Sequence, residues 1–269
     1  MGDKFKFTKT GGIYVVVEGK GFSILLNGKV QDAASIFRRN LFIQNLHPDL
    51  YSLKVTKDGF YPWEKRIVIV SEKVADVYPF NLPEKVDLVE IPKTILEDVD
   101  KKDTSTSSIA TTSKQEVDND EYAFAKDIFA TSSSRLVVQK LNASNTKALP
   151  KQFILYKKIA LWSERGEIFV QWQGDNDSAP LYFCAEDTCL NKLSVFKGAK
   201  INNADFITDK QTFVIFTTDS GIYVTEIDDR GGRNIQALVL GTGYDFRIGK
   251  DGTLFIKKEK KYYKVDISL

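Results

Sequence analysis

The chain has 269 residues, of which 42% are hydrophobic and 28% are charged, and its formal net charge is +2. This is an ordinary composition for a soluble globular protein, and the length suits two domains that each bury a core. No apolar run is long enough to cross a membrane, and the near-neutral charge argues against a nucleic-acid binder. The abundance of Phe (18) and Tyr (11) favours β structure.

Residues 1–11 are expected to be a polar lead-in, and residues 12–83 to form a small β-sandwich. No amphipathic helix is apparent there, whereas short apolar runs alternate with turn residues. Asn27-Gly28 is a strong signal for a two-residue hairpin turn. The predicted strands are Ile13–Glu18, Phe22–Leu26, a strand within Ile36–Ile43, the two arms of a hairpin over 45–70, and Val74–Phe80.

The hairpin over residues 45–70 carries the clearest period-two pattern in the chain. Tyr51, Leu53 and Val55 alternate with polar residues, and Ile67 and Ile69 continue the alternation after the turn. Asp58-Gly59 supplies a residue that tolerates positive φ. Trp63 is the large apolar side chain that so short a strand pair needs as an anchor.

These residues resemble the PEGA domain, a small β-sandwich found mostly on bacterial envelope and surface proteins. The resemblance rests on Ile24–Lys29 (Ile-Leu-Leu-Asn-Gly-Lys), Leu46–Val55 with its Leu-x-Pro-x-x-Tyr pattern, and Lys57–Lys65 with its Lys-x-Gly-Phe-x-x-Trp pattern. Gly19-Lys20-Gly21-Phe22 stands where the family has Pro-Glu-Gly-Ala, and Leu50 replaces a usual Gly. The family supplies no enzymatic residues, so the resemblance implies display, adhesion or scaffolding outside the cytoplasm.

Residues 84–121 are expected to be an acidic, Ser/Thr-rich linker. The segment holds 11 acidic and 5 basic residues, so it carries −6 while the rest of the chain carries +8. Composition of this kind over about 97–121 cannot bury enough apolar surface to offset the entropy of ordering. The apolar residues of 86–96 could still strap onto one of the domains.

From residue 122 to residue 269 the pattern predicts many short strands. One internal repeat is visible, because residues 214–227 match residues 254–267 without a gap at an offset of 40. A period near 40 with several strands per repeat is typical of propeller blades. The predicted strands are Leu136–Lys140, Phe153–Tyr156, Ile159–Trp162, Glu167–Trp172, Leu181–Cys184, Lys192–Phe196, Ala204–Ile207, Thr212–Thr217, Ile222–Ile227, Ile235–Leu240, Asp245–Ile248, Thr253–Lys257 and Tyr262–Ile267.

This second half resembles the divergent WD-repeat-like propeller segments that follow PEGA domains in some bacterial proteins. Ala204-Asp205-Phe206, the run 226–234 and the loop between Cys184 and Cys189 carry the similarity, although no Trp-Asp signature is present. The length allows three to four blades. The segment is therefore expected to be a truncated propeller, an open stack of sheets, or half of a ring that a second subunit completes through its sheet edges.

Cys184 and Cys189 bracket four residues, a spacing that suits a disulfide across a strand-end loop. Two free thiols remain the alternative. A metal site would need about four ligands, and the one His of the chain, His47, lies in the other half. If the disulfide forms, the protein belongs to an oxidising compartment.

Two motifs are candidate ligand surfaces. Tyr61 and Trp63 could stack on a sugar ring, or could be core aromatics that close the sandwich. Arg230-Gly231-Gly232-Arg233 could bind an anionic polymer, or could be a turn whose arginines pair with Asp228, Asp229 or Glu226. The structural interpretation is favoured for both.

Three further motifs are interpreted as structural. Lys257–Lys264 is expected to be a solvated hairpin tip, and Asp175-Asn176-Asp177 a turn without the remaining ligands of a calcium loop. His47 lacks the partners of an acyl-transfer triad. No catalytic residue, cofactor site or metal site is predicted.

The sequence thus predicts an all-β protein that acts without enzymatic activity as a binding or scaffold protein of the bacterial cell envelope. The expected partner is a protein or a cell-wall polysaccharide, with no nucleic acid, and with a membrane only through an anchor absent from this chain. The alternatives are a polysaccharide-binding protein or carbohydrate-active hydrolase that uses the propeller face, and a cytoplasmic interaction module.

Overall fold

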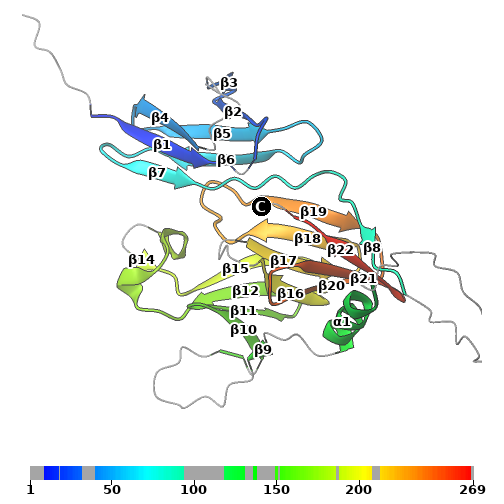
Figure 1. Cartoon of the computed structure of the whole chain (residues 1–269). Coiled ribbons are helices and arrows are strands. Elements are labelled where there is room, and N and C mark those ends of the chain that lie inside the picture. Colours follow the sequence, from blue (N-terminus) through cyan, green and yellow to red (C-terminus); the bar gives the residue numbers. More distant parts are fainter. Residues whose placement is uncertain are drawn as a thin grey trace, which may run out of the picture.

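The computed structural model describes residues 9–17, 19–31, 40–93, 118–130, 136–137, 149–150, 152–185, 188–207 and 213–267. The side chains of 118–120, 136–137, 185 and 188 are outside this description. Antiparallel sheets dominate, which confirms the all-β prediction at the level of fold class (Figure 1). The described residues also contain one α-helix, α1 (Asp118–Ala130), which the sequence analysis missed.

Two small sheets formed by residues 11–77 face each other as a sandwich. Ile13 and Val15 on one sheet and Leu53 and Val55 on the other belong to the same buried cluster. Strand β1 pairs antiparallel with β4 and parallel with β7. One sheet of the sandwich has the strand order β4 (Asn40–Leu46), β1 (Gly11–Val16), β7 (Val74–Val77). The other has the order β3 (Lys29–Val30), β2 (Ser23–Leu26), β5 (Leu50–Thr56), β6 (Trp63–Val68).

The turn predictions in this part are confirmed. Leu26 pairs with Lys29, which leaves Asn27 (φ 49°) and Gly28 (φ 75°) as a two-residue turn with both φ angles positive. Gly59 has φ 74°, as its place after Asp58 predicted. The predicted strand within Ile36–Ile43 is seen from residue 40 onward, and residues 32–39 lie outside the described part.

Three larger antiparallel sheets, here called the three-sheet stack, form the second half. The first is β15 (Lys192–Lys197), β12 (Glu167–Trp172), β11 (Ile159–Glu164), β10 (Phe153–Tyr156), β9 (Leu136–Val137). The second is β16 (Asn203–Phe206), β17 (Phe213–Thr218), β18 (Gly221–Glu226), β19 (Ile235–Leu240). The third is β20 (Tyr244–Ile248), β21 (Leu254–Lys258), β22 (Lys261–Val265), β8 (Val89–Glu90).

The connection from β12 to β15 contains two short 3-10 turns, η1 (Asn176–Ser178) and η2 (Leu181–Phe183), and a minimal hairpin of β13 (Cys184–Ala185) with β14 (Thr188–Cys189). The prediction of a strand over Leu181–Cys184 is therefore wrong for its first three residues. Pro180 precedes η2 and its carbonyl accepts a hydrogen bond from the Phe183 N–H at 2.8 Å, so the backbone turns here instead of extending.

The second sheet is buried on both faces. Along β17, Phe213 and Ile215 belong to the cluster shared with the sandwich and the third sheet, while Val214 and Phe216 belong to the cluster shared with the first sheet. This follows from the period of two along a strand, which sends successive side chains to opposite faces. The fully apolar run of β17 is thus explained by two buried faces.

The 40-residue repeat falls on equivalent strands of the second and third sheets. Its two copies cover β17–β18 and β21–β22, and each copy follows a first strand that carries Asp-Phe. In both, the Asp side chain accepts a hydrogen bond from the next N–H, at 2.7 Å for Asp205 and Phe206 and 2.8 Å for Asp245 and Phe246. The repeat is therefore structural as well as sequential.

The third sheet is completed by residues from the predicted linker. Val89 and Glu90 form β8 and pair with Lys264 and Tyr263 of β22. Helix α1 packs on this sheet through Ala125, which is buried with Phe255 and Tyr262. The expected strapping of residues 86–96 onto one of the domains is thus found in β8, whereas α1 begins at Asp118, inside the segment expected to be a linker. Residues 94–117 lie outside the described part.

One buried cluster joins the sandwich to the three-sheet stack, contrary to the expectation of two independent cores. It contains Trp63 and Leu82 with Ile222 and Phe246, and the Phe80 and Phe213 rings lie 4.9 Å apart. None of the helices in the described residues is long and apolar enough to cross a membrane.

Candidate functional site

The edge strand β6 of the sandwich meets the loop that follows β18, and we call this contact the joint. The Arg66 N–H donates to the Gly231 carbonyl at 2.9 Å. The Asn234 amide accepts from the Glu64 N–H at 3.1 Å and donates to the Glu64 carbonyl at 3.0 Å. The loop therefore satisfies the free backbone edge of β6 as a neighbouring strand would.

A buried ion pair lies at the centre of the joint. The Lys65 Nζ is 3.0 Å from Glu226 Oε2, and the two side chains are 4% and 6% exposed. The same Nζ donates to the Asp228 carbonyl at 2.8 Å. Because buried charges are costly unless they are paired and hydrogen-bonded, these contacts fix the partners closely.

Glu226 is also bound to Asn234. Its Oε1 accepts from both the Asn234 N–H and the Asn234 Nδ2, each at 2.7 Å. One carboxylate thus contacts an amine from the sandwich and an amide from the loop.

A second polar link connects the two halves beside the ion pair. The Gln236 side chain accepts from the Leu82 N–H at 2.7 Å and donates to the Phe80 carbonyl at 3.1 Å. Gln236 is itself buried. The joint is therefore held by directional polar contacts as well as by its apolar core.

The arginines predicted as a possible anion site are paired within the chain. Arg230 binds Asp228 through Nε and Nη2, at 2.9 Å and 2.8 Å. Arg233 donates to the carbonyls of Ser194, Val195 and Ile227 and lies 3.4 Å from Asp229. The structural interpretation of this motif is the one that the contacts support, and Arg233 ties the first sheet to the loop.

The ionisation of this cluster follows from burial and pairing. Burial disfavours the charged form of Asp228, but the hydrogen bonds and charge of Arg230, with the Lys65 charge, outweigh it and lower its pKa. Burial, and then the charge of Asp228, raise the pKa of the nearby Tyr182 hydroxyl well above its usual range. Burial lowers the pKa of the Arg233 guanidinium.

Trp63 cannot present its ring to a ligand, since only 1% of its surface is exposed. Tyr61 is half-buried against the same core. The possible ligand surface at Tyr61 and Trp63 is therefore ruled out for Trp63, and the favoured interpretation as a core aromatic is the one that its burial supports, since Trp63 is a core anchor opposite Val55. The sequence placed this motif and the arginine motif in separate domains, whereas the structure brings their neighbours Arg66 and Gly231 into contact.

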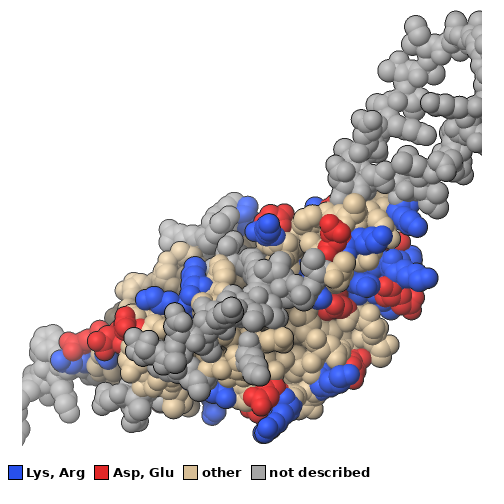
Figure 2. Space-filling view, turned by 90° about the horizontal axis from the view of Figure 1, so that it is seen from below, with Lys and Arg blue, Asp and Glu red and all other residues tan. Residues whose placement is uncertain are grey.

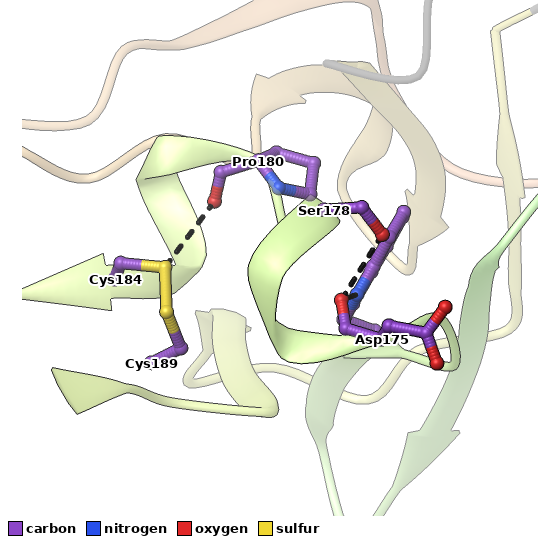
Figure 3. The surroundings of a disulfide bond; sticks show 6 residues. Asp175, Ser178, Pro180, Cys184 and Cys189 are labelled. Carbon is purple, nitrogen blue, oxygen red and sulfur yellow. Dashed lines mark hydrogen bonds between the residues drawn. A yellow bond between two sulfur atoms is a disulfide. The ribbon is translucent and has the colours of Figure 1, made fainter.

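The predicted disulfide between Cys184 and Cys189 is confirmed (Figure 3). The two residues face each other across β13 and β14.

Next to the disulfide, the Asp175 carbonyl accepts a hydrogen bond from the Ser178 hydroxyl at 3.1 Å and one from the Trp172 indole at 2.9 Å. Asp175-Asn176-Asp177 is thus part of a compact turn, and no group of His, Cys, Asp and Glu in the described residues is arranged to hold a metal ion.

The basic stretch 257–264 forms the hairpin of β21 and β22, with Glu259 at φ 55° in a two-residue turn, as predicted. Lys261 and Lys264 are paired with Glu90 and Glu121, at 2.8 Å and 3.0 Å. Figure 2 shows basic and acidic side chains interspersed over the coloured part of the face it presents.

The sequence analysis missed an exposed patch on the outer face of the β4–β1–β7 sheet, which we call the aromatic face. It comprises Tyr14, Asn40, Phe42, Val74 and Asp76. Phe42 and Val74 are 46% and 50% exposed. Tyr14 is paired with Phe42 on one side and Asp76 on the other, so these side chains share a face.

The aromatic face is locally ordered. The Asn40 amide donates to the Tyr14 hydroxyl at 2.6 Å, and the Tyr14 and Phe42 rings meet edge to face at 6.4 Å. The Phe42 ring also lies so close to Gly12 that a β-carbon there would collide with it. In the sequence, the Gly11-Gly12 pair just before the predicted strand Ile13–Glu18 was the signal for this close packing.

The sequence matches no protein family in a profile scan, and a search of curated proteins finds no match. A comparison with solved structures finds a Bacteroides fragilis protein of unknown function, thought to be membrane-associated, at 13% identity and a TM-score of 0.22. The match covers 96% of this chain and 94% of that chain. A score this low carries no argument, so the PEGA and propeller resemblances stay predictions.

Proposed function

We propose that this chain is a non-enzymatic binding or scaffold protein of the bacterial cell envelope that recognises a protein partner through the aromatic face. The aromatic face is the single observation that carries the proposal. Exposed aromatic side chains are enriched in protein interfaces, and Phe42 and Tyr14 are held in place by their packing on Gly12 and Asn40. A preorganised patch loses little entropy on binding.

The joint supports a scaffold role. Its contacts and the shared core hold the sandwich against the three-sheet stack, so a partner on the aromatic face would be presented at a fixed place relative to the stack. In this proposal the sandwich is PEGA-like, the stack is a three-bladed open propeller, and helix α1 covers the third sheet where another blade would pack.

The location outside the cytoplasm rests on the disulfide. Disulfides persist in oxidising compartments and are rare in the cytoplasm. To test this point, the protein is taken directly from its native cell under denaturing conditions and its free thiols are alkylated at once. The number of alkylated cysteines then gives the number of free thiols. Two free thiols would favour the cytoplasmic alternative.

Site-specific crosslinking in the native cell tests the binding surface. A photo-crosslinking residue at position 42 should capture one protein partner, and the same residue at position 68 is the matched control, since Val68 is 66% exposed on the other sheet. The captured band should disappear when Tyr14→Ala is added. Equal capture from positions 42 and 68, or no dependence on Tyr14, would contradict the proposed surface.

The alternative function, a polysaccharide-binding protein or carbohydrate-active hydrolase that uses the propeller face, makes a different prediction. A polysaccharide-binding protein should be retained on cell-wall fragments, whereas a hydrolase should release sugar products from them. We expect no released sugar products. We expect any retention of the protein on cell-wall fragments to be lost when the protein partner is removed.

A further inference from the structure

We propose that Lys65 and Asn234 become joined by an intramolecular amide bond, with Glu226 moving the protons. Such a bond would link the sandwich covalently to the three-sheet stack. The inference goes beyond the proposed function and does not depend on it, because it rests only on the geometry of the joint.

The three groups are already in contact through one carboxylate. Glu226 Oε2 lies 3.0 Å from the Lys65 Nζ, and Glu226 Oε1 lies 2.7 Å from the Asn234 Nδ2. A lysine amine is a nucleophile once it has lost a proton, and a carboxylate within hydrogen-bond reach can act as its base. The same carboxylate accepts a hydrogen bond from the Asn234 Nδ2, which is the nitrogen that the reaction releases.

Both polar atoms of the Asn234 amide are held by the backbone of Glu64. The Glu64 N–H donates to the Asn234 Oδ1 at 3.1 Å, so a hydrogen-bond donor faces the oxygen on which negative charge develops. The Asn234 Nδ2 is fixed from its other side by the Glu64 carbonyl at 3.0 Å. Lys65 and Glu226 are almost fully buried, so the amine and its proposed base are shielded from water.

The reaction balances without a co-reactant. Glu226 takes a proton from the Lys65 ammonium, and the free amine adds to the Asn234 Cγ. Glu226 gives this proton to Nδ2, and the C–N bond to Nδ2 breaks to release ammonia. The lysine nitrogen, which still carries one proton more than an amide nitrogen, loses it through Glu226 to the ammonia. The overall change is one ammonium and one primary amide giving one secondary amide and an ammonium ion, with Glu226 regenerated as a carboxylate.

The Asn234 position is specific among neighbouring side chains. Gln236 lies two residues further along and is more deeply buried, but its amide is bound to the backbone at Pro62, Phe80 and Leu82 rather than to Glu226. Lys54, on the adjacent strand, lies 3.6 Å from Glu64 and is 42% exposed. These residues provide matched controls.

The decisive measurement is the intact mass of the purified, reduced and denatured protein. We expect a mass lower than that of the encoded chain by one molecule of ammonia, and a proteolytic digest in which cleavage after Lys65 is lost and its peptide is joined to the peptide containing Asn234. Because ring closure at Asn27-Gly28 would give the same mass loss, the joined peptide is required. A wild-type protein of the encoded mass overturns the inference, as does a mass loss mapped to any other site.

Variants confirm the assigned roles. Glu226→Gln keeps the size and the hydrogen-bonding capacity of the side chain but removes the proton carrier, and Lys65→Met removes the nucleophile, so both should have their encoded masses. Lys54→Met should lose ammonia as the wild type does. Circular dichroism should first establish that each variant is folded. A folded Glu226→Gln variant that still forms the linked peptide would remove Glu226 from the reaction.

Discussion

Gly231 is the residue at which the joint can be tested most directly. Its backbone has φ 73°, and a β-carbon there would overlap the carbonyl oxygen of Arg66. The variant Gly231→Ala must therefore either distort the loop or move it away from β6. Moving it breaks the hydrogen bond from the Arg66 N–H, and it strains the neighbouring contact between Asn234 and Glu64.

The cost can be worked out from these contacts. A non-glycine residue with left-handed backbone angles costs about 1–2 kcal/mol. A lost hydrogen bond adds about 1 kcal/mol. We expect Gly231→Ala to lower the free energy of unfolding by roughly 2–3 kcal/mol.

Gly28→Ala is the matched control. Gly28 has φ 75°, almost the same as Gly231, but nothing lies within 4 Å of the position of its β-carbon. It should show the backbone cost alone, about 1–2 kcal/mol. Urea denaturation gives the two free energies, and hydrogen exchange of the Arg66 amide should accelerate in Gly231→Ala and stay unchanged in Gly28→Ala. Equal losses for the two variants would refute the close contact between the loop and β6.

Three further outcomes follow from the structure. Replacing both Cys184 and Cys189 by Ser should lower the free energy of unfolding by only about 2 kcal/mol, because the closed loop is short. In urea melts, a reductant should destabilise the wild type by the same amount and leave the variant unchanged. Trp63→Ala should cost about 3–5 kcal/mol because the ring is buried, whereas the exposed Phe42→Ala should change the urea midpoint only slightly. The pKa of Asp228 is lower in the folded protein than its ordinary value of 3.8, so its contribution to stability is present above that value and is lost as pH falls through the folded pKa. Arg230→Met should therefore flatten the loss of stability below about pH 4 in acid titrations followed by fluorescence; an unchanged acid limb would argue against the pairing.

Local patterns in the sequence predicted most of the strands. The alternation of Leu53 and Val55, the Asn27-Gly28 turn and the 40-residue repeat each depend on residues close together in the chain, and each is found in the structure. Helix α1 was missed because it begins in the acidic segment and most of its residues are polar or small. Its helical conformation is supported by packing of Ala125 and Tyr122 on the third sheet, which is formed more than 100 residues later.

The candidate site was harder to predict than the fold. Trp63 and Arg230 were selected as unusual residues. Arg230 pairs locally with Asp228, but the buried core around Trp63 includes Ile222 and Phe246, which lie more than 150 residues away in the chain. Lys65 was passed over because a lysine in an alternating strand is normally exposed, and its contacts with Glu226 and Asp228 explain why it is buried. A Lys on the apolar side of the β6 pattern, between Trp63 and Ile67, was the one available signal.

The pairing of β8 with β22 has a consequence for biosynthesis. Residues 89–90 leave the ribosome well before their partners at 263–264, which are made more than 170 residues later. The third sheet, and with it the core shared with the sandwich, can be completed only when β22 is available. We therefore expect a nascent chain that still lacks β22 to depend on chaperones, and a fragment ending near residue 93 to be unsuitable as a stand-alone domain for biochemical work.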